Sequence, residues 1–167
     1  ALAVAAARAD DADTMVQLAE AAQEAVVAER ELHGGFMQQF GVTPEQFAAV
    51  PLSPSAEHYT SFLLATAWGA PWPVAMAALL PCFWIYAEVG RDAVGRSAPG
   101  NPWQAWVDTY ADEHFHGLVT RMRATIDRIA AASTPAVREQ MHAAYTQAAR
   151  LEWMFWDAAY RLEQWPV

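Results

Sequence analysis

Apolar residues recur at steps of three and four along most of the chain, which is the spacing of one face of a helix. No segment alternates apolar and polar residues with a period of two, and no Asn-Gly or Asp-Gly pair marks a hairpin turn. The clearest packed face lies between about residues 11 and 39 and consists of Leu18, Ala21, Ala22, Ala25, Ala28 and Leu32. The pattern therefore predicts an all-α protein.

Proline, glycine and hydroxyl-bearing residues divide this pattern into five or six helices joined by short loops. Thr43-Pro44-Glu45-Gln46 combines an N-cap, a proline at the first helical position and a glutamine that completes a capping box. Residues 1–8 match the end of a helix that began earlier. Further helices are expected over about 53–69, 72–94, 102–131 and 135–164. We expect a helical bundle in a single domain covering residues 1–167.

Composition narrows the class of protein. The hydrophobic fraction of 54% excludes a disordered chain, and the charged fraction of 17% lies below the roughly 25% of a typical soluble domain. Such a deficit suggests that other subunits cover part of the surface. A net charge of −9 without a basic cluster argues against nucleic acid and anionic membranes as partners, and polar residues interrupt the apolar runs that a membrane-spanning helix would need.

The only cysteine lies in the apolar stretch from Leu79 to Gly90. A single cysteine excludes an intramolecular disulfide framework and a zinc-cysteine cluster, and a cytoplasmic protein fits best. Pro81 removes a backbone donor and is expected to disturb the helix. Cys82 and Tyr86 are one turn apart and share a helix face. A lone cysteine in an apolar run is usually a small core residue, so a core role and a chemical role both remain open.

Three further polar groups lie in apolar surroundings: Tyr59, Tyr110 and Glu152. The tyrosines can be core residues with hydroxyls at the rim, and Glu152 either faces solvent or is a buried carboxyl with a raised pKa. Together with Cys82 and Tyr86 they also suit a pocket for a flat heteroaromatic ligand. In such a pocket aromatic rings enclose the ligand, a thiolate attacks it, and a carboxylic acid protonates it.

A metal site is the competing chemistry, because Glu29 and His33 are one helical turn apart and Glu113-His114 lies on another helix. Di-metal sites in helical bundles use Glu-x-x-His pairs, and the chain has none. The chain also lacks the glycine-rich nucleotide-binding motifs and the Gly-x-Ser-x-Gly nucleophile motif.

Taken in order, these residues resemble the thiaminase II (TenA) family of the heme-oxygenase-like fold, over essentially the whole chain. The Leu-Pro-Cys segment and the Glu-x-x-Phe-Trp segment are specific as a pair at this separation. The segments that carry the resemblance are Glu29-Arg30-Glu31-Leu32-His33, Pro51-Leu52-Ser53-Pro54, Tyr59-Thr60-Ser61, Leu79 to Gly90, Trp106 with Thr109-Tyr110, Glu152 with Phe155-Trp156, Ala159-Tyr160-Arg161, Glu163 and Trp165.

The resemblance implies a hydrolase of thiamin biosynthesis and salvage that acts on thiamin or on aminopyrimidines derived from it, releasing ammonia from the latter. It implies a homotetramer without cofactor or metal. Cys82 is expected to add to the pyrimidine ring, and Glu152 to carry the proton on a ring nitrogen. Tyr59, Tyr86 and Tyr110 are expected to line the pocket.

One feature of the family is not matched. The family carries an upstream segment whose aspartate holds the edge of the aminopyrimidine, whereas Asp10, Asp11 and Asp13 lie in an expected interhelix loop. We therefore expect a chain that lacks the N-terminal helices. Two alternatives remain open: a non-catalytic pyrimidine-binding or regulatory module on the same fold, and a helical metal-dependent oxidase.

Overall fold

The computed structural model describes residues 1–167, which form nine helices and no strand, so the predicted all-α class is confirmed. The helices are α1 (Leu2–Ala7), α2 (Ala12–Phe40), α3 (Pro44–Ala48), α4 (Pro54–Gly69), α5 (Trp72–Leu79), α6 (Pro81–Val94), α7 (Gln104–Ala111), α8 (Glu113–Ala132) and α9 (Pro135–Arg161).

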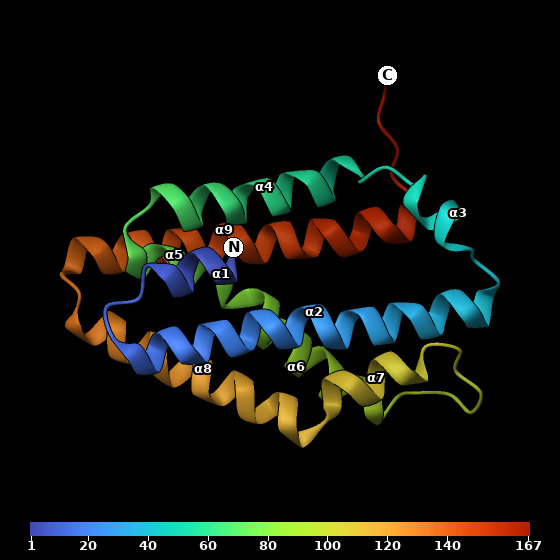
Figure 1. The fold of residues 1–167 in the computed structure, drawn as a ribbon, viewed down its shortest axis with the longest axis horizontal. Helices are drawn as coiled ribbons and strands as arrows, with labels where there is room; N and C mark the ends of the chain where they lie inside the picture. Colours follow the sequence, from blue (N-terminus) through green and yellow to red (C-terminus); the bar gives the residue numbers. More distant parts are fainter.

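The long helices run along the long axis of the molecule, with α4 beside α9 on one side and α7 and α8 on the other (Figure 1). Helix α5 lies at the centre, where it packs on α9, α8, α4 and α1. Every residue from Val74 to Leu79 is buried, and the main core gathers around Met76, Leu18 and Met122. The apolar composition of α5 thus reflects a helix surrounded by others.

The predicted helix starts are confirmed at several points. Asp11 caps α2 by accepting from the Thr14 N–H at 2.7 Å, and Gly41 ends this helix in the left-handed region at φ 67°. The capping box of Thr43 and Gln46 is present at the start of α3. Ser53 is the N-cap of α4. These local signals fixed helix boundaries because each satisfies backbone donors that the first turn leaves free.

Two expected helices are divided. The expected helix over 72–94 is interrupted at Leu80, which keeps helical dihedrals (φ −62°, ψ −39°), because Pro81 lacks the N–H that would continue the ladder. The expected helix over 102–131 is broken at Asp112, whose backbone is extended (ψ 141°) and whose side chain accepts from the His114 N–H at 2.8 Å. A new helix cap therefore starts α8.

The two consecutive helices α5 and α6 form the most apolar stretch of the chain. The segment Trp72–Val94 is long and apolar enough to cross a membrane by length and composition, so the expectation that polar residues break every such run was too strict. However, 61% of its most apolar window is buried inside the bundle. Burial by α9, α8 and α4 accounts for this composition without a membrane.

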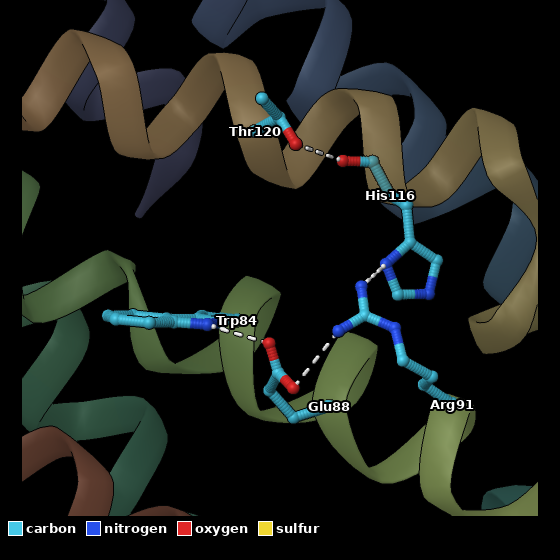
Figure 2. A network of polar contacts seen from close by, with 5 residues as sticks. All are labelled: Trp84, Glu88, Arg91, His116 and Thr120. Atoms are coloured by element: carbon cyan, nitrogen blue, oxygen red, sulfur yellow. Dashed lines mark hydrogen bonds and ion pairs between the residues drawn. The ribbon is translucent and has the colours of Figure 1, made fainter.

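Helix α6 has two different faces. Trp84, Glu88 and Arg91 form a polar ladder on one face, in which the Trp84 indole donates to Glu88 at 3.1 Å and Arg91 donates to Glu88 at 3.2 Å (Figure 2). Arg91 also donates to Nδ1 of His116 on α8 at 2.9 Å. Because Cys82 and Tyr86 are offset by about half a turn from this ladder, they lie on the opposite face.

Candidate active site

A cavity of about 720 Å³ lies on the Cys82 side of α6. Its lining comes mainly from α2, α4, α6, α7, α8 and α9. The five residues that the sequence singles out all contribute to this lining: Tyr59, Cys82, Tyr86, Tyr110 and Glu152. The structure thus brings together side chains from four helices that are far apart in the sequence.

Cys82 is the second residue of α6, directly after the interruption of the helix at Pro81. Its thiol donates to the carbonyl oxygen of Leu79 at 2.9 Å. Burial raises the pKa of the Cys82 thiol to about 12, and the negative charge of Glu152 adds to this effect. The resting thiol is therefore protonated at neutral pH, and it becomes a nucleophile when its proton is transferred.

Glu152 lies on α9 and is only 1% exposed, which resolves the question of whether it faces solvent or the interior. The Tyr59 hydroxyl donates to its Oε2 atom at 2.7 Å. Burial raises the pKa of the carboxyl, and the donors on Tyr59, Tyr86 and Trp156 partly oppose that shift. The balance favours a carboxyl that can hold a proton at higher pH than an exposed glutamate can.

The thiol and the carboxyl influence each other, because each group is harder to ionise when the other is charged. A state with one negative charge shared by the pair is more favourable than a state with two. This coupling suits the transfer of a single proton between sulfur, carboxyl and a bound ligand.

Tyr86 and Tyr110 line one side of the cavity, and Trp106 and Trp156 pack against them. The ring of Tyr86 lies 4.8 Å from that of Tyr110 and 5.6 Å from that of Trp156, measured between centroids, and Trp106 lies 4.8 Å from Tyr110. Burial raises the pKa of Tyr59, Tyr86 and Tyr110 well above the usual range for tyrosine. Their hydroxyls are therefore neutral donors, and the rings offer flat surfaces to a heteroaromatic ligand.

Tyr110 reaches the cavity because α7 approaches α6 closely at Gly90. A Cβ atom at Gly90 would lie 2.6 Å from both the carbonyl carbon and the oxygen of Tyr110. Only glycine allows this separation between the two backbones.

Glu29 on α2 is a site residue whose role was missed. The Tyr110 hydroxyl donates to its carboxylate, which also pairs with His33 at 3.1 Å. The sequence indicates Glu29 and His33 only as candidate metal ligands and as markers of the family resemblance. No group of three or more His, Cys, Asp or Glu side chains is arranged to hold a metal ion, so the metal-dependent alternative finds no converging ligand set.

Helix α2 forms another wall of the cavity. Of the expected packed face, Leu18 and Ala21 are buried, whereas Ala25 and Ala28 are exposed and border the cavity. The only aspartate in the lining is Asp112. The three aspartates near the start of the chain lie at and beside the N-cap of α2, outside the cavity lining: Asp10, Asp11 and Asp13.

The nine helices place a thiol, a buried carboxyl and aromatic rings around one cavity. The model of the TENA/THI-4/PQQC family matches residues 1–162, and the chain belongs to this family. The predicted resemblance to the TenA family and the predicted all-α fold are therefore confirmed.

Individual relatives and solved structures agree with this family assignment. The chain is similar to an aminopyrimidine aminohydrolase of Bacillus subtilis, with 35% identity over 161 residues that cover 96% of this chain and 68% of that protein. It is 34% identical to a thiamine biosynthesis multifunctional protein ThiED of Corynebacterium efficiens, covering 96% of this chain and 21% of that protein. A TenA homologue from P. horikoshii OT3 has a TM-score of 0.83 and 28% identity, covering 96% and 74% of the two chains. The predicted hydrolase class is confirmed by such relatives.

Proposed function

We propose that this chain is an aminopyrimidine aminohydrolase of the thiaminase II type that acts in thiamin salvage. The observation that carries the proposal is the placement of Cys82 and the buried, Tyr59-bonded Glu152 in one cavity walled by aromatic rings. Cys82 is the nucleophile and Glu152 the acid and base. Tyr59, Tyr86 and Tyr110 bind the pyrimidine. The name of the Bacillus subtilis relative supports the substrate class.

The reaction begins when the Cys82 proton moves to the Glu152 carboxylate. The sulfur then forms a bond to the ring carbon beside the one that carries the aminomethyl arm, and the adjacent ring nitrogen takes the proton from Glu152. The amine of the arm is protonated at neutral pH. Because the ring is no longer aromatic, the C–N bond can break with its electron pair going to the nitrogen, which leaves as ammonia, and electrons from the ring form an exocyclic methylene on a ring that carries the positive charge.

Water completes the cycle by adding to the methylene carbon, and its displaced proton leaves with ammonia as ammonium. The C–S bond then breaks, the ring nitrogen returns its proton through Glu152 to the sulfur, and the aromatic ring is restored. A carboxyl with a raised pKa suits both directions of this transfer, because it gives and recovers a proton near neutral pH.

The test is ammonia release from 4-amino-5-aminomethyl-2-methylpyrimidine by the protein and its Cys82→Ser variant. We expect release by the protein and at least a thousandfold loss in the variant, because a serine hydroxyl is a much weaker nucleophile than a thiolate. Circular dichroism should show that the variant is folded. Full activity of Cys82→Ser would exclude covalent catalysis.

A second candidate function is pyrimidine binding without hydrolysis. The pKa of about 12 for the Cys82 thiol favours it, because the resting cavity contains little thiolate. Saturable binding of the aminopyrimidine by calorimetry, without ammonia release, would favour this candidate.

The state of the protein in the cell is a further part of the proposal. We propose a cytoplasmic homotetramer whose partners are a small pyrimidine and copies of itself, without nucleic acid or membrane. The charged fraction of 17% and the net charge of −9 support this view. A free nucleophilic thiol also suits a reducing compartment.

A further inference from the structure

Tyr59 and Glu152 come from two different helices that meet mainly through apolar side chains. Helix α4 carries Tyr59 and helix α9 carries Glu152, and the two lie side by side (Figure 1). The apolar contact between them consists of Phe62, Leu63, Ala148, Leu151 and Phe155 around Tyr59. Apolar contacts are non-directional, so by themselves they define the axial position of one helix on another less strictly than hydrogen bonds do.

The segment after α9 supplies directional contacts to the start of α4. Leu162 adopts the left-handed region at φ 52° and ends α9. The Glu163 carboxylate then accepts from the Ser55 backbone N–H at 2.9 Å. Two residues later, the Trp165 indole donates to the Leu52 carbonyl oxygen at 2.9 Å. The chain just beyond α9 is thus attached to the residues on both sides of the α4 N-cap.

Glu163 satisfies a donor that α4 cannot satisfy by itself. Pro54 has no N–H, and the Ser53 hydroxyl accepts from the Ala56 N–H at 3.2 Å, which leaves the N–H of Ser55. Ser55 is only 5% exposed. The Glu163 carboxylate also faces the positive end of the α4 dipole. The hydrogen bond from the Ser55 N–H lowers the pKa of Glu163, so this carboxylate is ionised at neutral pH.

We propose that Glu163 is a positioning residue that fixes the axial register of α4 against α9, so that the Tyr59 hydroxyl meets the Glu152 carboxyl. Ser55 and Tyr59 are one helical turn apart, roughly 6 Å along the axis. A shift of α4 by a fraction of that length would separate the 2.7 Å contact between Tyr59 and Glu152. The inference rests on the proposed function only where it assigns Glu152 a part in catalysis.

Loss of Glu163 should alter the ionisation of Glu152 through Tyr59. The Tyr59 hydrogen bond lowers the pKa of Glu152 against the larger effect of burial, so a weaker bond leaves this pKa higher. Three tyrosines and one thiol also titrate near the Glu152 carboxyl, and each has a raised pKa: Tyr59, Tyr86, Tyr110 and Cys82. The other ionisable side chains that line the cavity are Glu24, Glu29, Glu31, Asp112 and His114, and Glu29 accepts from Tyr110.

The test is a titration of Glu152 by NMR on protein labelled with 13C at the glutamate carboxyl, with the signal assigned by its loss in Glu152→Gln. We expect Glu163→Ala to raise the Glu152 midpoint in the same direction as Tyr59→Phe. Glu163→Gln should stay close to the wild type, because its amide oxygen can still accept from Ser55. Thr134→Ala is the matched control, since it removes an N-cap hydroxyl from α9 at the opposite end of that helix from Glu163.

An unchanged midpoint in Glu163→Ala, or an equal shift in Thr134→Ala, would overturn the proposal. Where Glu163→Ala does not fold, Glu163→Asp replaces it, because the shorter side chain keeps the charge and cannot hold the same register. A midpoint in Glu163→Asp equal to that of the wild type would overturn the proposal as well.

Kinetics give a second readout in the form of a double-mutant cycle. We expect Glu163→Ala to lower kcat/KM about tenfold in the wild-type background and less than twofold in Tyr59→Phe, since it acts through Tyr59. Equal losses in both backgrounds would contradict the proposal. A shifted midpoint in a protein that releases no ammonia would mean that the hydrolase proposal fails while the positioning role stands.

Discussion

Glu152 is 1% exposed among aromatic side chains, where an ionised carboxylate is less stable than it is in water. Because burial raises its pKa above the model-peptide value of 4.5, the folded state binds the proton more tightly than the unfolded state does. The free energy of unfolding therefore falls as the pH rises from about 4.5 through the higher pKa of the folded protein. The buried Glu152 carboxyl thus lowers stability at neutral pH.

Glu152→Gln should consequently be more heat-stable than the wild type at pH 8, with a smaller difference at pH 5. The amide oxygen can still accept from Tyr59, and the buried charge is removed. For a chain of this size, each kcal/mol regained corresponds to a rise in Tm of about 2–4 °C. Differential scanning calorimetry across this pH range provides the measurement.

The control for this prediction is Glu139→Gln, which removes an exposed carboxylate from the same helix. Its Tm difference from the wild type should change little between the two pH values. If Glu152→Gln lost stability at every pH, the prediction would be wrong. Such a result would mean that the hydrogen-bond donors around Glu152 fully offset the cost of burying its charge.

At the scale of elements, the site depends on the close approach of α6 and α7. Gly90→Ala would place a Cβ atom 2.6 Å from the backbone of Tyr110, and backbone cannot move aside as a flexible side chain can. We expect a loss in the free energy of unfolding of about 1–3 kcal/mol, as for other overpacked substitutions. Displacement of Tyr110 should also raise KM for the pyrimidine.

The matched control is Gly34→Ala in α2, where a Cβ atom meets nothing within 4 Å. Since alanine favours a helix interior over glycine, this variant should gain roughly 0.5–1 kcal/mol. Urea unfolding of both variants measures the difference. A Gly90→Ala variant as stable as the wild type would mean that α7 can move away from α6 without loss.

The sequence was sufficient to predict the helices and caps that depend on local signals, such as the Thr43 capping box. It predicted the shared face of Cys82 and Tyr86 because that face follows from helical spacing alone. The sequence did not predict the break at Asp112, because residues that favour a helix lie on both sides of it. The Asp112 side chain accepts from the backbone N–H of His114 and so starts a new helix there. The sequence also missed the contact of Glu29 with Tyr110, because 81 residues separate the pair in the sequence.

The alanines of α2 show a related limit. Ala25 and Ala28 follow the spacing of a packed face, yet they border the cavity. Periodicity reports that a face is apolar, and it does not distinguish a neighbouring helix from a ligand cavity. Whether this face of α2 contacts another helix or borders the cavity depends on how all the helices pack together.

At the scale of the whole molecule, the outer surfaces of α4 and α9 expose large apolar side chains. Trp68 is 70% exposed on α4, and Trp153 and Tyr160 are 67% and 90% exposed on α9. Exposed aromatic side chains and few charges are typical of surfaces that other subunits cover. The proposed homotetramer would bury such surfaces.

Light scattering after size-exclusion chromatography should therefore give a mass four times the 18.4 kDa of the chain. Trp68→Glu and Trp153→Glu should each lower this mass, because a charged side chain in an apolar contact is desolvated without a partner. Gln140→Glu, at an exposed position of α9, adds the same charge elsewhere on the surface and should leave the mass unchanged. A monomer at micromolar concentration would contradict the tetramer, and a tetramer unaffected by either tryptophan variant would place its interfaces on other helices.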